Sequence, residues 1–169
     1  MSPNGDLWIS SKPGFFLPVK ILSRVFPGKL LSKFEAASWP LVEAFGASRF
    51  YEETERASAV FANEREAEVL TGRLGVQAAA TLGARYRLAA VKMDRRGAVV
   101  CVDGAVTTAP AEQVHEVDPT GAGDAFDGVL LAMLALGAAP VEALARACHA
   151  GSLVAGSRQA WPEPGASRG

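Results

Sequence analysis

The stretch DPTGAGDAF, residues 118–126, sets the expectation for the fold. The residues after it are apolar at helical spacing, so the stretch opens a helix. Gly121, Ala122 and Gly123 carry little or no side chain, so ligand atoms can approach their main chain closely. Successive N–H groups at the start of a helix bind anions, and the helix dipole helps them. The stretch therefore predicts an anion-binding turn between a strand and a helix.

Asp124 places a carboxylate in the first turn of that predicted helix. A carboxylate beside an anion cradle repels a bound phosphate, so its natural role there is to take a proton from an attacking hydroxyl. Asp is also a favoured N-cap residue, and Gly121 and Gly123 also suit a simple tight turn. These residues by themselves leave both interpretations open.

Strands and helices are expected to alternate along the rest of the chain. The predicted strands cover residues 57–62, 87–93, 98–102, 105–108 and 112–117, with a type I′ turn at Asp103-Gly104. The predicted helices cover residues 19–26, 64–70 (ended by Thr71-Gly72), 76–82 (with Gly83 as C-cap), 126–137 and a last one that starts at Pro140. This order, closed by two packed helices, indicates an α/β layer architecture.

Composition narrows the class of protein. The chain has 169 residues, enough for one domain or for one domain and a small appendage. Seventeen Lys and Arg residues against eighteen Asp and Glu residues give a net charge of -1, which argues against nucleic acid or an anionic membrane as partner. The sequence shows no signal pattern and no apolar run of the ~18 residues that a membrane span needs, so a cytoplasmic location is expected. Cys101 and Cys148 are expected to be buried, reduced thiols.

Two segments in this order resemble the PfkB, or ribokinase-like, carbohydrate kinases. Residues 118–126 match the family signature D-[TP]-T-G-A-G-D-A-F throughout, and NEREA at 63–67 with LTG at 70–72 is similar to its N-x-x-E-A…L-T-G segment. The resemblance covers residues 33–156 and includes a weaker segment at 37–41. It implies an α/β fold, the C-terminal part of a three-layer αβα sandwich whose N-terminal half is missing. Residues 1–32 would then be an irregular segment and residues 157–169 a flexible tail.

The resemblance also implies a chemistry, which is ATP-dependent phosphoryl transfer to a hydroxyl of a sugar or nucleoside. Asp124 matches the catalytic base, and Gly121, Ala122 and Gly123 match the anion hole. Asn63 and Glu66 match the motif that positions Mg²⁺ and phosphate, largely through water, so Glu66 is also a weak metal ligand by this resemblance. The remaining nucleotide or phosphate candidates are Lys92, Gly97, Thr120, His149 and Gly151. A monovalent cation is a further cofactor that the family leaves open.

Several individual residues also suit purely structural roles. Asn63 would also serve as a helix N-cap, and Glu66 would also suit a solvated helix face. His115 suits a loop or strand end, and His149 suits a helix face against a neighbour. Asp94 stands where the family's T-x-G-x-x-G turn has its first glycine, and Asp is one of the few residues that tolerate a positive φ.

The chain departs from the family in length, because nothing in it matches the N-terminal half with its lid and sugar-gripping Gly-Gly segment. The sugar pocket would then be mostly missing and an apolar sheet edge exposed, which favours self-association or pairing with a complementary N-terminal half. Three functions stay open: an active kinase, a truncated remnant that binds nucleotide weakly or pairs with another chain, and an anion-binding module without nucleotide. The acceptor is not identified among ribose, fructose, 2-keto-3-deoxygluconate, adenosine and pseudouridine.

Overall fold

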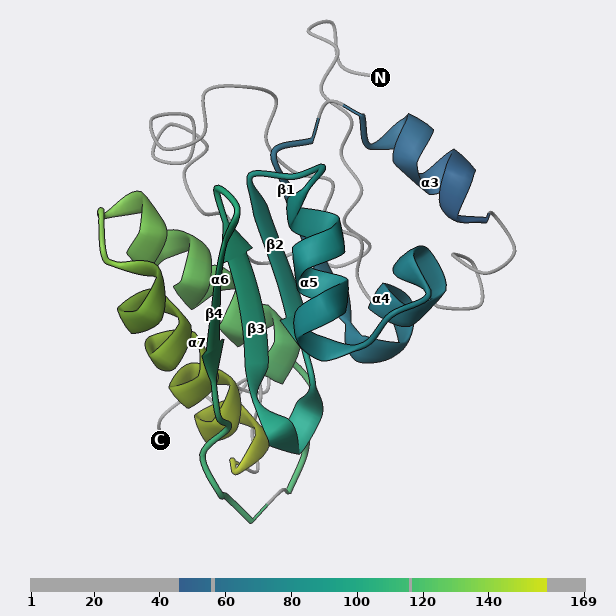
Figure 1. The fold of residues 1–169 in the computed structure, drawn as a ribbon. Helices are drawn as coiled ribbons and strands as arrows, with labels where there is room; N and C mark the ends of the chain where they lie inside the picture. The colour runs from purple at the N-terminus through teal and green to yellow at the C-terminus, as the bar shows by residue number, and fades with distance from the viewer. Residues whose placement is uncertain (1–45, 56, 116, 158–169) are drawn as a thin grey trace, which may run out of the picture.

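A mixed four-stranded sheet lies between two layers of helices in the computed structural model, which describes residues 46–55, 57–115 and 117–157 (Figure 1). The strand order is β1-β2-β3-β4. The first pair is parallel and the other two pairs are antiparallel. The strands are β1 (Ala59–Asn63), β2 (Leu88–Lys92), β3 (Ala98–Val102) and β4 (Ala105–Ala109). All four predicted strands from 57 to 108 are therefore confirmed within two residues at each end.

Helices cover both faces of this sheet (Figure 1). One face carries α4 (Glu64–Thr71) and α5 (Gly75–Gly83), with α3 (Ala47–Glu53) beside α4. The other face carries α6 (Ala122–Ala135) and α7 (Pro140–Ala155), which pack on each other. A single 3₁₀ turn, η1 (Asp94–Arg96), joins β2 to β3. Within the described residues no helix is both long and apolar enough to cross a membrane.

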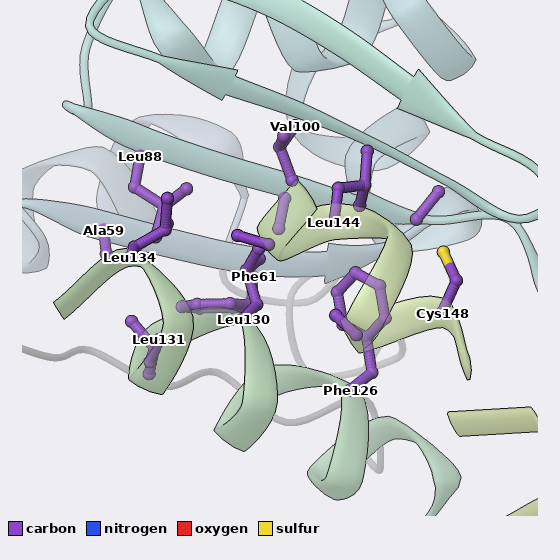
Figure 2. Packing of buried hydrophobic residues seen from close by; sticks show 14 residues of the cluster. Ala59, Phe61, Leu88, Val100, Phe126, Leu130, Leu131, Leu134, Leu144 and Cys148 are labelled. Atoms are coloured by element: carbon purple, nitrogen blue, oxygen red, sulfur yellow. The ribbon is translucent and has the colours of Figure 1, made fainter. Parts of the chain in front are cut away.

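The core is split in two because alternate side chains of each strand point to opposite faces. Phe61, Leu88 and Val100 face α6 and α7, where Leu130 and Leu144 are fully buried against them (Figure 2). The opposite face holds the other half of each strand with residues of α4 and α5: Val60, Ala62, Ala89, Val91, Val99, Cys101, Ala67, Leu70, Ala78 and Leu82. Both faces are apolar, so β1, β2 and β3 read as continuous apolar runs rather than alternating ones.

The turns and helix ends have the conformations that their residue types predict. Asp103 and Gly104 both have positive φ, 46° and 85°, as a type I′ turn requires. Gly72 ends α4 in the left-handed conformation at φ 67°. Pro140 lies in the first turn of α7, where its missing N–H costs nothing. Cys101 and Cys148 are buried free thiols, as expected.

The strand predicted at 112–117 is wrong for the residues that the structure describes there. The main-chain N–H groups of Val117 and Asp118 instead donate to the carbonyl of Ala155 at 2.8 and 3.1 Å. Val114 and Val117 are 41% and 48% exposed, so their alternation with polar residues does not mark a buried sheet face. The segment crosses to the end of α7 because hydrogen bonds there satisfy its backbone.

Two further expectations need correction. Gly83 is the last residue of α5, and the C-cap is Ala84 in the right-handed conformation. No other described strand pairs with the outer edge of β1, but its residues Ala59–Ala62 are at most 2% exposed. These fractions count main chain as well as side chain, so this edge of the sheet is covered, and the expectation of an exposed apolar edge is wrong. The helix predicted at 19–26 and the segment 37–41 lie outside the described residues.

Candidate functional site

Four elements meet at one corner of the sheet. Asn63 and Lys92 are the last residues of the parallel strands β1 and β2, and they pair in register. The chain enters α4 directly after Asn63, and the first turn of α6 lies over Lys92, since a Cβ built on Gly123 would be 3.4 Å from Lys92 Nζ. Carboxyl ends of parallel strands and N-termini of helices therefore share this corner, as in ligand sites of other α/β sheets.

The turn before α6 is built by local hydrogen bonds. The side chain of Asp118 accepts from the N–H of Thr120 at 2.9 Å, and the N–H of Ala122 donates to the carbonyl of Pro119 at 3.1 Å. Hydrogen bonds from the side chain and the main chain of Thr120 lower the pKa of Asp118. Gly121 is the N-cap of α6 in the left-handed conformation, at φ 85°. A side chain at this position would be strained, which explains the glycine.

The first turn of α6 carries the predicted base. Asp124 lies in that turn and is exposed. The N–H groups of a helix's first turn have no intrahelical acceptor, so the amides of Gly123 and Asp124 belong to the set that can face an anion. The structure thus places Asp124 and Gly121–Gly123 at the start of one helix, with the N–H of Ala122 donating to Pro119.

Asn63 and Glu66 form a capping box at the start of α4. The side chain of Asn63 accepts from the N–H of Glu66 at 2.8 Å, and Glu66 Oε2 accepts from the N–H of Asn63 at 2.9 Å. The N-cap interpretation of Asn63 is therefore confirmed. The solvated-face interpretation of Glu66 is wrong, because the residue is 3% exposed. Glu66 faces inward since the reciprocal hydrogen bond holds it at the end of β1.

The second carboxylate oxygen of Glu66 is the notable atom of this box. Oε1 is buried and has no hydrogen-bond partner among the described residues. Burial raises the pKa of Glu66 above its ordinary value of 4.5, and the nearby carboxylate of Asp127 raises it further. The hydrogen bond from Asn63 and the ammonium of Lys92 act in the opposite direction. A buried acceptor without a donor suits a water molecule that is held by a cation or a phosphate.

Lys92 is paired with Asp127, a residue that was not predicted from the sequence to belong to the site. Its Nζ is 3.0 Å from Oδ1 and 3.2 Å from Oδ2 of Asp127, and the side chain of Asp127 is 5% exposed. Asp127 lies four positions after Gly123, on the same face of α6. That spacing is the signal that could have found it, once Gly123 was assigned to the anion hole.

The other predicted residues make structural contacts. Gly97, at φ 92°, has no room for a side chain, since a Cβ would be 2.0 Å from the carbonyl oxygen of Ala109. Gly151 of α7 lies against the main chain of α6, where a Cβ would be 3.2 Å from the carbonyl oxygen of Ala122. His149 is exposed and its Nδ1 lies 2.8 Å from Glu112 Oε1. The site thus brings together Asn63, Glu66, Lys92, Asp127 and the turn at 121–124, with Gly151 behind it.

Asp94 occupies η1, the turn that follows Lys92. Its φ is 50°, a positive value of the kind that Asp tolerates. His115 lies in a loop and is exposed, in agreement with the loop interpretation.

The residues present fit a polyphosphate with Mg²⁺. Amides of a helix terminus beside an ammonium suit phosphate oxygens. No group of three or more His, Cys, Asp and Glu that could hold a metal ion occurs in the described part of the chain. Mg²⁺ is commonly held by one or two carboxylates, several waters and the substrate phosphates, and the unpartnered oxygen of Glu66 fits that arrangement.

The family model of the pfkB family carbohydrate kinases matches residues 41–163. The chain belongs to this family. Its fold is accordingly the C-terminal part of a ribokinase-like αβα sandwich, and the mixed sheet with helices on both faces is the part of that sandwich seen here.

Solved kinase structures are similar over most of the described chain. A probable sugar kinase protein from Rhizobium etli CFN 42 is 26% identical with a TM-score of 0.62, over 69% of this chain and 36% of that one. Adenosine kinase from Sinorhizobium meliloti is 28% identical with a TM-score of 0.62, over 69% and 37%. A fructokinase double mutant from Vibrio cholerae O395, bound to fructose, ADP and potassium ion, is 25% identical with a TM-score of 0.56, over 66% and 39%.

These matches cover only part of the length of the solved kinases. The chain spans little more than a third of the length of the three solved kinases. A separate, short similarity links it to y4qJ of Sinorhizobium fredii (strain NBRC 101917 / NGR234), a protein inferred to be a transposase, at 56% identity over 36 residues. That match covers 21% of this chain and 9% of that protein, so it assigns no activity here.

Proposed function

We propose that this chain catalyses ATP-dependent phosphoryl transfer to a hydroxyl of a sugar or nucleoside. The observation that carries the proposal is the helix N-terminus at Gly121–Asp124, where the first-turn amides lie beside one exposed carboxylate. Membership of the PfkB family supports the reaction class. We assign the kinase part to residues 33–156, and the acceptors bound or named in related structures, fructose and adenosine, set the substrate classes to test first.

In this mechanism Asp124 takes the proton from the acceptor hydroxyl as it attacks. The amides of Gly121 and Gly123 stabilise the charge that develops on the transferring phosphoryl group, whereas the N–H of Ala122, the third predicted member of the anion hole, donates to Pro119. Asn63 and Glu66 hold water at the end of β1, where Glu66 Oε1 is an available acceptor. When bound, Mg²⁺ supplies charge neutralisation on the phosphates. Positioning and charge, rather than covalent chemistry by the protein, account for the reaction.

The remaining nucleotide contacts belong to the same proposal. Lys92, Gly97 and Thr120 surround the turn and the end of β2, and we assign them to the phosphate side. His149 and Gly151 lie on α7, and Gly151 lies against the start of α6; we assign both residues to the nucleotide side. The potassium ion in the related fructokinase supports a monovalent cation as a third cofactor with ATP and Mg²⁺.

The test is the exchange Asp124→Asn in the full chain, assayed with Mg·ATP against a panel of sugars and nucleosides. We expect kcat to fall by roughly 10²–10⁴, the usual contribution of a general base. The matched control is Asp103→Asn, another exposed carboxylate to amide exchange, at the hairpin turn. Its kcat should equal that of the unmodified chain. Turnover that survives Asp124→Asn would remove Asp124 from the role of base.

A second function rests on the observation that the chain spans only 36–39% of the length of the three solved kinases described above. In this alternative it binds nucleotide without turnover, or pairs with another copy or with a complementary chain. Calorimetry with Mg·ATP beside the kinase assay separates the two functions, since binding without turnover supports the alternative. Sedimentation of the purified chain tests self-association, and no thermal shift with Mg·ATP would favour a module without nucleotide.

A further inference from the structure

An ion pair lies directly beneath the turn that we propose to bind phosphate. Lys92 Nζ contacts both carboxylate oxygens of Asp127 at 3.0 and 3.2 Å. The side chains are 22% and 5% exposed, so the pair is largely shielded from water. It joins residues 35 positions apart, the end of β2 and the start of α6. The pair therefore fixes where the ammonium lies relative to the first turn of α6.

The ammonium is close to the main chain of that turn because Gly123 has no side chain. A Cβ at Gly123 would lie 3.4 Å from Lys92 Nζ. The N-terminus of a helix carries a partial positive charge, so a cation beside it is unfavourable unless an anion accompanies it. Asp127, one turn further along, supplies a negative charge within the protein. A phosphoryl group at the turn would supply a second one, on the open side.

Glu66 does not compete for Lys92 by hydrogen bonding. Its Oε2 is taken by the N–H of Asn63 at 2.9 Å, and its Oε1 has no partner among the described residues. Lys92 and Asp127 nevertheless shift the pKa of Glu66 in opposite directions, which places all three charges within one electrostatic neighbourhood. Asp127 is thus the carboxylate that sets the position of the ammonium.

We propose that Asp127 is a positioning residue, which holds the Lys92 ammonium beside Gly123 so that it binds a phosphoryl oxygen of the nucleotide. The inference rests on the proposed function of the turn, and Asp127 itself does not touch the ligand. It predicts that removal of a negative charge weakens the binding of an anion. A carboxylate that acted only through space would weaken anion binding, so its removal would strengthen binding. If the carboxylate instead positions the ammonium, its removal weakens anion binding.

The experiment is calorimetric titration of the full chain with Mg·ATP. We expect Asp127→Asn and Lys92→Met each to raise Kd about tenfold, as for the loss of one charge-assisted hydrogen bond. The double variant should bind no more weakly than Lys92→Met alone, because both changes remove the same contact. Asp103→Asn is the matched control, since Asp103 pairs with Arg87 at 2.9 Å at the opposite end of β2. Its Kd should not change.

Loss of stability must be distinguished from loss of ligand binding in these variants. Asp127→Asn leaves a shielded ammonium without its carboxylate, so thermal unfolding is measured for each protein. Lys92→Gln combined with Asp127→Asn replaces the ion pair by a neutral polar pair of similar shape, which buried sites tolerate. Its Kd should match that of Lys92→Met, and a Kd equal to that of the unmodified chain would overturn the proposal.

The remaining outcomes separate the two proposals. If the unmodified chain binds Mg·ATP and Asp127→Asn binds it equally or more tightly, the positioning role is wrong and the function stands. If Asp127→Glu, which keeps the charge, recovers part of the affinity lost in Asp127→Asn, positioning of the ammonium is supported. If the unmodified chain shows no binding at millimolar Mg·ATP, both the proposed function and this inference fall.

Discussion

Gly151 of α7 lies against the carbonyl oxygen of Ala122, the first residue of α6. A Cβ on Gly151 would be 3.2 Å from that oxygen and 3.6 Å from the Cβ of Phe126. The two helices approach this closely at the turn proposed to bind phosphate. Packing of α7 therefore sets the position of the first turn of α6, and a residue assigned to the nucleotide side has a structural task as well.

Gly151→Val tests this contact. The larger side chain must displace the first turn of α6, and we expect a loss of about 1–3 kcal/mol in the free energy of unfolding. Affinity for Mg·ATP should fall with it, because the amides of the turn move. Urea unfolding and calorimetry check the two effects. Leu153→Ala, on the exposed side of α7 at 57% exposure, is the control and should change neither quantity appreciably. Unchanged stability in Gly151→Val would show that α7 can move away freely.

Gly97→Ala tests the close approach between the start of β3 and the end of β4. The new Cβ would lie 2.0 Å from the carbonyl oxygen of Ala109, and the residue sits at φ 92°. We expect a loss of about 3 kcal/mol or more, from the clash together with backbone strain. Gly104→Ala is the matched control, because Gly104 has φ 85° but nothing within 4 Å of its Cβ position. Strain alone should cost it about 1–2 kcal/mol. Equal losses in the two variants would contradict the clash.

The raised pKa of Glu66 predicts a pH dependence of stability. Because the folded protein holds the proton of this carboxyl more tightly than the unfolded chain does, the associated stability is full below about pH 4.5 and is lost as pH rises through the folded pKa. Glu66→Gln keeps an acceptor for the N–H of Asn63 but removes the charge. The free energy of unfolding of the unmodified chain, minus that of Glu66→Gln, should therefore fall with rising pH across this window.

Urea unfolding at a series of pH values measures that difference. Taking the difference cancels Asp103 and Asp118, whose lowered pKa values act in the opposite direction in both proteins. At neutral pH the variant should be as stable as the unmodified chain or more stable. If Glu66 holds water for Mg²⁺, the same variant should bind Mg·ATP more weakly, so stability and affinity would change in opposite senses. A flat difference with pH would show that burial does not penalise the charge.

Features set by neighbours in the chain could be predicted from the sequence. The turn at Asp103-Gly104, the left-handed end of α4 at Gly72 and the N-cap at Asn63 each depend on a few adjacent residues. All three features could therefore be assigned to the correct elements from the sequence. The place of Asp124 in the first turn of a helix could also be predicted, because helical spacing and a glycine turn are both local signals.

Features that depend on contacts across the fold could not be predicted in this way. The pair of Lys92 with Asp127 spans 35 positions, and the need for glycine at Gly97 comes from the distant main chain of Ala109. Alternation of apolar residues at 112–117 suggested a strand, but hydrogen bonds to Ala155 decide that segment. Helix α3 (Ala47–Glu53) was not predicted at all. In each case the deciding partner lies in another element.

The hairpin turn at Asp103-Gly104 has a practical consequence for experiments on this protein. Lys92 pairs with Ala98 at one end of the sheet, whereas Val102 pairs with Ala105 at the other, so the turn is separated from the site by the length of the strands. Gly104 has no atom within 4 Å of its Cβ position. A fluorophore or an affinity tag inserted there would report on ligand binding from a distance, without entering the corner where the ligand is expected.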